Sequence, residues 1–197
     1  MGVGTGGSGV ARAAVAVGRL IAGDVPIAGA AVWIHAAVDV PGARTKPIAT
    51  ATTEADGRFR FEIPKGTSRR IEVRYRAFST DERDSAIWRF KVAVPAPIRL
   101  TASPRRLENG DNLRLTASVA GGRVPIRSAD VAFQVRIGRQ WRTFARRSLG
   151  RRSRAVVDHR FRVTFDRMTY RFRALTLKRR AFPYANAVSR VASVRVN

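Results

Sequence analysis

Hydrophobic and polar residues alternate along much of this chain, with the two-residue period of a β-strand that has one buried and one wet face. The pattern is clearest at residues 56–61 (DGRFRF), which are followed by a second alternating run at 74–78 (RYRAF). About a hundred residues later the pattern is written again, at 158–163 (DHRFRV) and 171–175 (RFRAL). A repeated hairpin-like unit in a chain of 197 residues predicts two β-domains in tandem.

Short apolar segments separated by Gly, Pro, Asn and Asp predict a series of strands, and no segment keeps a helical period over three turns. The expected strands lie near 13–21, 30–38, 47–53, 58–63, 70–78, 86–94, 98–103, 112–119, 130–137, 140–147, 155–165, 169–177 and 188–196. We therefore expect an all-β fold of two tandem β-sandwich domains. Its parts are a flexible lead-in at 1–11, a first sandwich at 12–94, a Pro-rich linker at 95–97 and a second sandwich at 98–197.

The chain has a formal net charge of +24, and residues 98–197 hold 24 of its 38 Lys and Arg residues but only 5 of its 14 Asp and Glu residues. All but four of the basic residues are arginine. Alternation places many of them on the outer faces of strands, where their stems cover apolar sheet and their charged ends stay in water. Arginine is also the better residue for binding phosphate or sulfate. A coding sequence rich in G and C explains the same excess, and both interpretations stay open.

The first half resembles the carboxypeptidase regulatory-like domain, a small transthyretin-type sandwich. The resemblance covers residues 17–94 and is carried by segments 18–20 (GRL), 25–32 (VPIAGAAV) and 53–61 (TEADGRFRF), with Glu54 where that family usually has Asp. The second half is similar to the immunoglobulin-like sandwich that follows such domains in large secreted bacterial proteins. That likeness is carried by segments 138–144, 158–163, 170–174 and 183–185. These resemblances imply Greek-key or immunoglobulin-like topology and a role as stalk, spacer or binding surface, without peptidase activity.

Few residues in the chain could support catalysis, metal binding or a cofactor. Cysteine is absent and the two histidines, His35 and His159, stand alone, so we expect no catalytic residues, no metal site and no cofactor. His159 occupies the position that Gly57 holds in the first copy of the pattern, which favours a role in a turn. Residues 81–84 (DERD) are interpreted as a solvated loop, because Arg83 within them opposes a bound cation. A G-x-G-x-x-G match at residues 2–7 lacks a preceding strand and is not interpreted as a cofactor site.

Two loops and two tryptophans are the candidate ligand-binding residues. The basic loops can converge on phosphate or sulfate groups, and they contain Arg146, Arg147, Arg151, Arg152 and Arg154 in one loop and Lys178, Arg179 and Arg180 in the other. Trp33 and Trp141 are the tryptophans whose burial alternation does not assign, and an exposed tryptophan on a sandwich can stack on sugar rings. Packing inside the protein is the alternative role for both.

We therefore expect a non-enzymatic, monomeric structural or adhesive segment of a larger exported or cell-surface protein. The alternative is a binding module for anionic cell-wall polymers, through the arginine loops, or for glycans, through the tryptophans. No known nucleic-acid motif accompanies the charge, so we expect no specific nucleic-acid partner. No apolar run is long enough for a membrane span or a signal-peptide core, so the export signal is expected to lie outside this chain.

Overall fold

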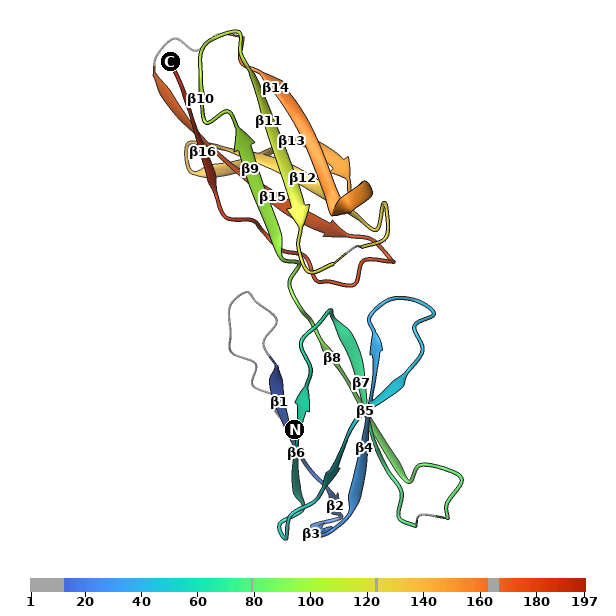
Figure 1. Ribbon diagram of the computed structural model, residues 1–197. Helices are drawn as coiled ribbons and strands as arrows, with labels where there is room; N and C mark the ends of the chain where they lie inside the picture. Colours follow the sequence, from blue (N-terminus) through green and yellow to red (C-terminus); the bar gives the residue numbers. More distant parts are fainter. Residues whose placement is uncertain (1–12, 79, 123, 163–166) are drawn as a thin grey trace. The chain divides into compact units, whose positions relative to one another are not determined.

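The computed structural model describes residues 13–78, 80–122, 124–162 and 167–197. The chain divides into two compact units, with the boundary between Val94 and Pro95, and each is described by itself (Figure 1). No helix among the described residues is long and apolar enough to cross a membrane. The lead-in at 1–11, the glycine pattern at 2–7, Val163 and Phe165 lie outside the described residues, so what was expected of them stays a prediction.

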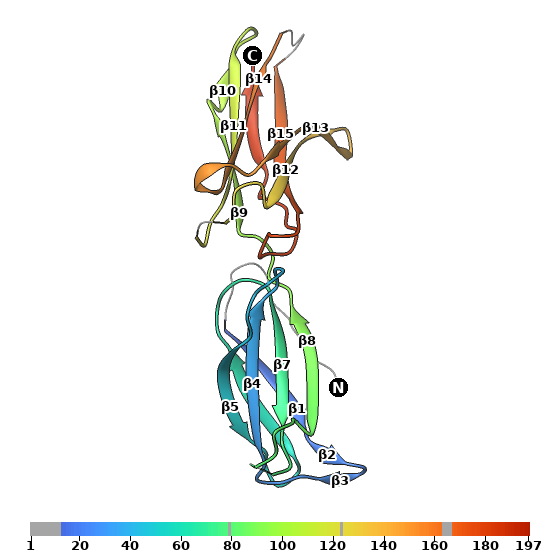
Figure 2. The same cartoon turned by 90° about the vertical axis from the view of Figure 1, so that its right-hand side faces the viewer.

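The described residues of unit 1, the chain up to Val94, form eight strands. They are β1 (Ala14–Arg19), β2 (Ile21–Ala22), β3 (Val25–Pro26), β4 (Ala31–Val38), β5 (Lys46–Thr52), β6 (Arg58–Ile63), β7 (Arg69–Tyr75) and β8 (Ala86–Val92). β5, β4, β7 and β8 form an antiparallel four-stranded sheet, and β1 pairs with β6 as a second layer behind it (Figure 2). β2 and β3 make a short hairpin between β1 and β4.

The core of unit 1 lies between these two layers and consists of the apolar residues that alternate along each strand. Val32, Ile34 and Ile71 are completely buried on the four-stranded sheet, and Phe59 and Phe61 cover them from β6. Because two strands cannot cover four, the inward side chains of β8 are only half-buried. The alternation at 58–61 therefore matches the two faces of β6: both Phe side chains face the core and both Arg side chains face solvent.

In unit 2, from Pro95 onward, the residues that the structure describes form eight further strands and one short 3-10 turn. They are β9 (Ile98–Ser103), β10 (Arg106–Leu107), β11 (Asn112–Val119), β12 (Ala129–Ile137), β13 (Gln140–Ser148), η1 (Arg151–Ser153), β14 (Arg154–Arg160), β15 (Met168–Lys178) and β16 (Ala192–Val196). A three-stranded sheet of order β14-β11-β9 packs on a five-stranded sheet of order β10-β16-β15-β12-β13. Phe133, Leu113 and Leu115 are completely buried between them.

The chain enters unit 2 at one end of the sandwich and leaves it at the other (Figure 1). At the entry end Ala96 donates its backbone N–H to the carbonyl of Ala185 (3.1 Å) and is itself buried, so the stretch 95–97, expected as a linker, packs on unit 2. At the exit end β10 pairs in parallel with β16, and Asn197 donates to the carbonyl of Leu107 (2.9 Å). The second and last strands of the unit are thus bonded to each other near the exit.

The all-β, two-sandwich fold class is confirmed, and the described strands match the expected ranges within a few residues except at two: β14 ends at Arg160 instead of near 165, and the last strand begins at Ala192 instead of near 188. The alternation missed only the shortest elements: β2, β3, β10 and η1. Two interpretations of the doubled pattern were wrong. In each copy the two runs do not form a hairpin, because the first lies in the smaller sheet and the second in the larger one. His159 is not in a turn: it lies within β14, opposite Leu113.

Candidate functional site

Strand pairing at the entry end of unit 2 brings the two basic loops together. β12 lies between β13 and β15, so its first residues are flanked on one side by the end of β13 and on the other by the end of β15. Asp130 is opposite Ser148 and Val131 is opposite Arg147, while Ala129 is opposite Lys178. We call the exposed cations gathered here the basic end of unit 2, comprising Arg127, Arg146, Arg147, Arg151, Arg152, Arg154, Lys178, Arg179 and Arg180.

Asp130 is the carboxylate that links the two loops, and the sequence analysis did not single it out. Its Oδ1 accepts a hydrogen bond from the hydroxyl of Ser148 (2.6 Å), at the end of β13. Its Oδ2 accepts from Nε (3.0 Å) and Nη2 (2.7 Å) of Arg179, just after β15. The bond from Ser148 holds the pKa of the Asp130 carboxyl below its ordinary value, with smaller contributions from Arg179 and from the charge of Arg146. Asp130 is therefore an anion at neutral pH that fixes one arginine of the basic end.

The turn that carries Arg151 and Arg152 is held from beneath by a buried serine. Ser153 is 3% exposed, and its Oγ accepts a hydrogen bond from the backbone N–H of Val124 (3.0 Å) and donates to the carbonyl of Gly122 (3.4 Å). Arg152 and Ser153 both have left-handed backbone conformations, with φ of 58° and 55°. Such angles are unusual for residues other than glycine and are kept only where the surroundings fix them. Both arginine side chains of the turn consequently project into solvent.

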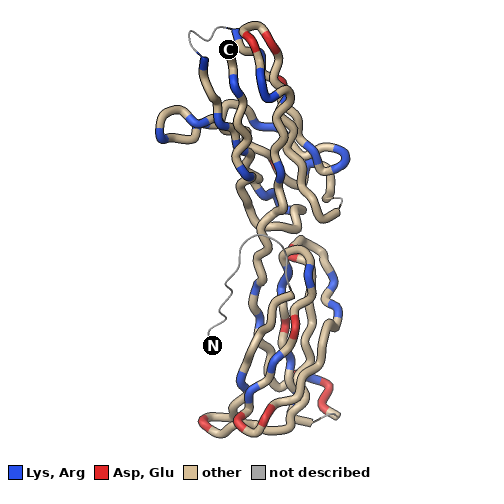
Figure 3. Tube along the Cα trace, turned by 60° about the vertical axis from the view of Figure 1, so that its left-hand side comes forward, with Lys and Arg blue, Asp and Glu red and all other residues tan. Residues whose placement is uncertain are grey.

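Carboxylates neutralise arginines elsewhere in the molecule far more than at the basic end. Figure 3 shows unit 2 with many basic positions and few acidic ones. On the small sheet of unit 2, Arg114 donates to both oxygens of Asp158 (2.8 and 3.2 Å), a bond that lowers the pKa of Asp158. At the basic end, nine exposed cations share one end of the unit with the described carboxylate Asp130, which is already bonded to Ser148 and Arg179. This region therefore combines a strong positive field with exposed guanidinium groups that can donate to anionic oxygens.

Both tryptophans proposed as sugar-stacking residues are half-buried and each has a guanidinium over its ring. The Cζ of Arg76 lies 5.9 Å from the ring centroid of Trp33. The Cζ of Arg173 lies 4.3 Å from that of Trp141, and Arg173 is fixed by a bond from its Nε to the side-chain oxygen of Gln134 (2.8 Å). Cation–π contacts of this kind use the ring face that a sugar needs for stacking. The geometry favours packing within the protein for both tryptophans.

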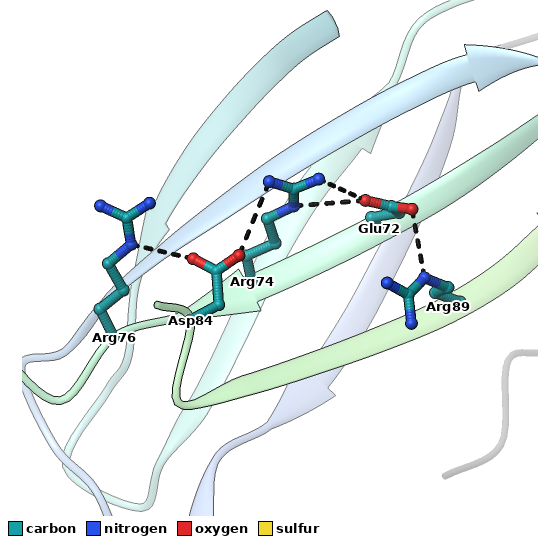
Figure 4. A network of polar contacts seen from close by, with 5 residues as sticks. All are labelled: Glu72, Arg74, Arg76, Asp84 and Arg89. Carbon is teal, nitrogen blue, oxygen red and sulfur yellow. Dashed lines mark hydrogen bonds and ion pairs between the residues drawn. The ribbon is translucent and has the colours of Figure 1, made fainter. Parts of the chain in front are cut away.

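The outer face of the larger sheet in unit 1 carries a network of two carboxylates and three arginines (Figure 4). Glu72 accepts hydrogen bonds from Arg74 (2.6 Å) and from Arg89 on the neighbouring strand (3.2 Å). The Oδ1 of Asp84 accepts a hydrogen bond from Nε of Arg76 (2.9 Å), and its Oδ2 forms an ion pair with Nη1 of Arg74 (3.6 Å). These contacts hold the loop that contains Asp84 against β7. The hydrogen bond from Arg74 is the main reason that the pKa of Glu72 lies below its ordinary value. Both carboxylates of the network, Glu72 and Asp84, bond arginines within it, so the network stabilises the loop.

Replacing Glu72 with glutamine is expected to lower the unfolding free energy of unit 1 by about 1 kcal/mol at pH 7, since the side chain is mostly buried and bonds two arginines. Because folding lowers the pKa of Glu72, its contribution is complete above the ordinary pKa of 4.5 and is lost as the pH falls through the lowered value. Urea unfolding should therefore give a difference at pH 7 that shrinks near pH 2. Glu62→Gln, at an exposed position on β6, is the matched control. A difference that is the same at both pH values would contradict the role of the carboxylate.

The histidines and the acidic loop 81–84 do not come together. In that loop Asp81 accepts a hydrogen bond from the backbone N–H of Phe78 (3.2 Å), and Asp84 belongs to the arginine network. His159 contacts the edges of Phe161 and Phe144, with centroids 5.0 and 5.9 Å away. Across the described ranges, no three His, Asp or Glu residues are placed to hold a metal ion. His159 is a packing residue in this arrangement.

Comparisons with known proteins find likeness of fold. No protein-family profile matches the chain, and no curated protein does. Among solved structures, the adhesin InvE of Yersinia pseudotuberculosis is 14% identical with a TM-score of 0.40, over 95% of this chain and 55% of that one, so the chain spans about half of InvE. The D0–D1 domain of intimin is 14% identical (TM-score 0.35, 93% and 90% covered). Fibronectin(III)-like modules of Clostridium thermocellum CbhA are 12% identical (TM-score 0.33, 95% and 85% covered). These neighbours contain β-sandwich domains of the immunoglobulin-like and fibronectin III-like kinds.

Proposed function

We propose that this protein is a non-enzymatic structural or adhesive segment of a larger exported or cell-surface protein. The observation that carries the proposal is that two self-contained sandwiches follow one another directly, with the boundary between Val94 and Pro95 and a separate core on each side. Unit 2 also receives the chain at one end and releases it at the other. This is the arrangement that lets sandwich units be joined in series as a spacer.

We further propose that unit 1 is of the carboxypeptidase regulatory-like type. Three segments carried that resemblance, and they are hydrogen-bonded to one another. Leu20 donates its N–H to the carbonyl of Gly57 (2.8 Å), Ile27 donates to the carbonyl of Leu20 (3.1 Å) and Gly29 donates to that of Thr53 (3.0 Å). The motif residues thus build one corner of the sandwich, which gives their spacing a structural reason and needs no peptidase chemistry.

Protease treatment of intact cells that produce the protein tests its location. Proteinase K in the medium is expected to degrade the protein while a cytoplasmic marker in the same cells survives. Exposed loops rich in arginine also make it a good substrate for trypsin, which can be used as a second enzyme. Protection from both enzymes until the cells are lysed would contradict an exported or surface role.

The alternative function is a binding module for anionic polymers, and the basic end of unit 2 favours it over glycan binding. The strand order brings the eight candidate cations of the two loops to one end of unit 2, where Asp130 bonds Arg179, whereas Trp33 and Trp141 each have a ring face covered by an arginine. A surface of this kind suits attachment of the segment to an anionic wall or coat. A structural segment and an anion-binding one are compatible roles for the same chain.

A further inference from the structure

We propose that the basic end of unit 2 is a binding site for a linear phosphate polymer and that Asp130 is its positioning residue. The inference rests on the proposed anion-binding function and gives it a ligand class and an organising residue. It depends on four observations, which concern the convergence of the cations, the place of Asp130, the distribution of partnered arginines and the burial of the nearby aromatic rings.

Most cations of the basic end come from two strand ends, which flank the start of β12, and from one rigid turn. Arg146 and Arg147 are at the end of β13, Lys178 and Arg179 are at the end of β15, and the turn 151–153 lies between β13 and β14. Neighbouring strands are about 4.8 Å apart, so β13 and β15, with β12 between them, lie about 10 Å apart, and their cations can meet separate phosphates of one flexible chain. The planar guanidinium matches two phosphate oxygens at once, which an ammonium group does not.

Asp130 connects the two basic loops through hydrogen bonds to both of them. Its two oxygens accept hydrogen bonds from different elements. One bond comes from Ser148, the last residue of β13, and the other from Arg179, which follows β15. The carboxylate therefore holds Arg179 over the strand ends and keeps the two basic loops in register. It also lowers the local positive charge by one. Positioning and charge thus act in opposite directions on the binding of an anion, which allows an experiment to separate them.

Arginines on other surfaces are already paired where carboxylates are available. Glu72 and Asp84 hold the three arginines of the network in unit 1, and Asp158 holds Arg114. At the basic end, by contrast, the described carboxylate Asp130 bonds one arginine, Arg179, of the eight that belong to it. An anionic polymer therefore gains most by lying here, where it releases the most counterions and displaces no carboxylate.

The aromatic rings at the same end of the sandwich are not available for base stacking. Phe182 is 0% and Tyr184 is 6% exposed, and they pack edge-to-face against each other with centroids 5.7 Å apart. Binding of single-stranded nucleic acid relies on exposed aromatic rings beside the basic groove. Phe144, two residues before Arg146 on β13, is 38% exposed but packs edge-to-face against Phe172 and His159. These contacts favour a phosphate chain without bases as the ligand.

Long-chain inorganic polyphosphate is the probe, titrated with the full chain at several salt concentrations. The variant Arg146→Gln/Arg151→Gln/Arg180→Gln is expected to bind about tenfold more weakly than the parent at about 100 mM salt, with a smaller dependence of log affinity on log salt. The control Arg106→Gln/Arg139→Gln/Arg195→Gln removes the same charge from exposed positions away from the basic end and should lose no more than about twofold. Equal losses in the two variants would overturn the site.

Asp130→Asn and Asp158→Asn separate positioning from charge, because each raises the net charge by one. Asp158→Asn should leave polyphosphate binding unchanged or slightly tighter, whereas Asp130→Asn should weaken it by about threefold despite the added positive charge. Tighter binding by both variants would overturn the role of Asp130. Single-stranded oligo(dT) of equal charge should bind more weakly than polyphosphate, and equal or tighter binding would overturn the ligand class. Thermal unfolding verifies the fold of each variant, and the cell-surface protease test is independent of all these results.

Discussion

Replacing Gly57 with alanine is expected to destabilise unit 1 by about 3 kcal/mol or more. Gly57 has a φ of 78°, and an added Cβ would press against the backbone carbonyl oxygen of Leu20. That carbonyl cannot move freely, because it accepts the hydrogen bond from Ile27 while Leu20 in turn donates to Gly57. Strain in the left-handed region and a clash with fixed backbone therefore add together. Urea unfolding of the full chain should show a shifted transition for unit 1 alone.

Gly23→Ala is the control for the backbone conformation at Gly57. Gly23 has a similar φ of 60°, but an added Cβ there has open space around it. The variant is expected to cost about 1 kcal/mol, which is the strain without the clash. If the two alanine variants destabilised the protein equally, the close approach of Gly57 to Leu20 would not be the cause of the destabilisation. The tight packing of segments 18–20, 25–32 and 53–61 at this corner would then be contradicted.

Replacing Phe133 with alanine is expected to destabilise unit 2 by about 3–5 kcal/mol. The ring is completely buried, on the strand that lies between β13 and β15, so its loss leaves a cavity at the centre of the larger sheet. Asp130 is the second residue of the same strand, which means that loosening β12 also disturbs the basic end. Chemical unfolding monitored by tryptophan fluorescence, with Trp141 in the same unit, is a suitable measurement.

Phe144→Ala provides the comparison for Phe133, since Phe144 lies on the neighbouring strand β13 and is 38% exposed. Its removal should cost about 1–2 kcal/mol, because part of the ring is already in water and the space can fill with solvent. A loss of stability for Phe133→Ala no larger than that for Phe144→Ala would contradict the burial of Phe133 in the core of unit 2.

The strands were predicted well because alternation of polar and apolar residues depends only on neighbouring positions in the sequence. Alternation at 58–61 and 170–174 is set by the two faces of a strand, and each Phe and Arg there lies on the expected side or half-way to it. What alternation cannot show is which strands become neighbours. For that reason the two runs of the doubled pattern were interpreted as a hairpin, although the second of them crosses to the other sheet. His159 was misplaced for the same reason, since its partner Leu113 is distant in sequence.

The candidate cations were recognised from the sequence, but their assembly was not. Residues 146–154 and 178–180 become one surface only because β12 separates β13 from β15, and that order depends on long-range pairing. Asp130 gave a weak signal, as one of only five carboxylates in a half with 24 basic residues. The covering of Trp33 by Arg76 is likewise a contact between separate elements of the sheet and its following loop. Composition identified the right residue types and topology decided which of them meet.

The pairing of β10 with β16 has a mechanical consequence if unit 2 carries load as part of a spacer. Force applied at Pro95 and Asn197 pulls β10 and β16 in opposite directions along their length, since the two strands are parallel and the chain enters and leaves at opposite ends. The backbone bonds of Arg195 to Arg105 (2.9 Å) and of Asn197 to Leu107 (2.9 Å) lie across that direction. They are therefore sheared together instead of being unzipped one after another, and the rupture force of the unit is set at this short ladder.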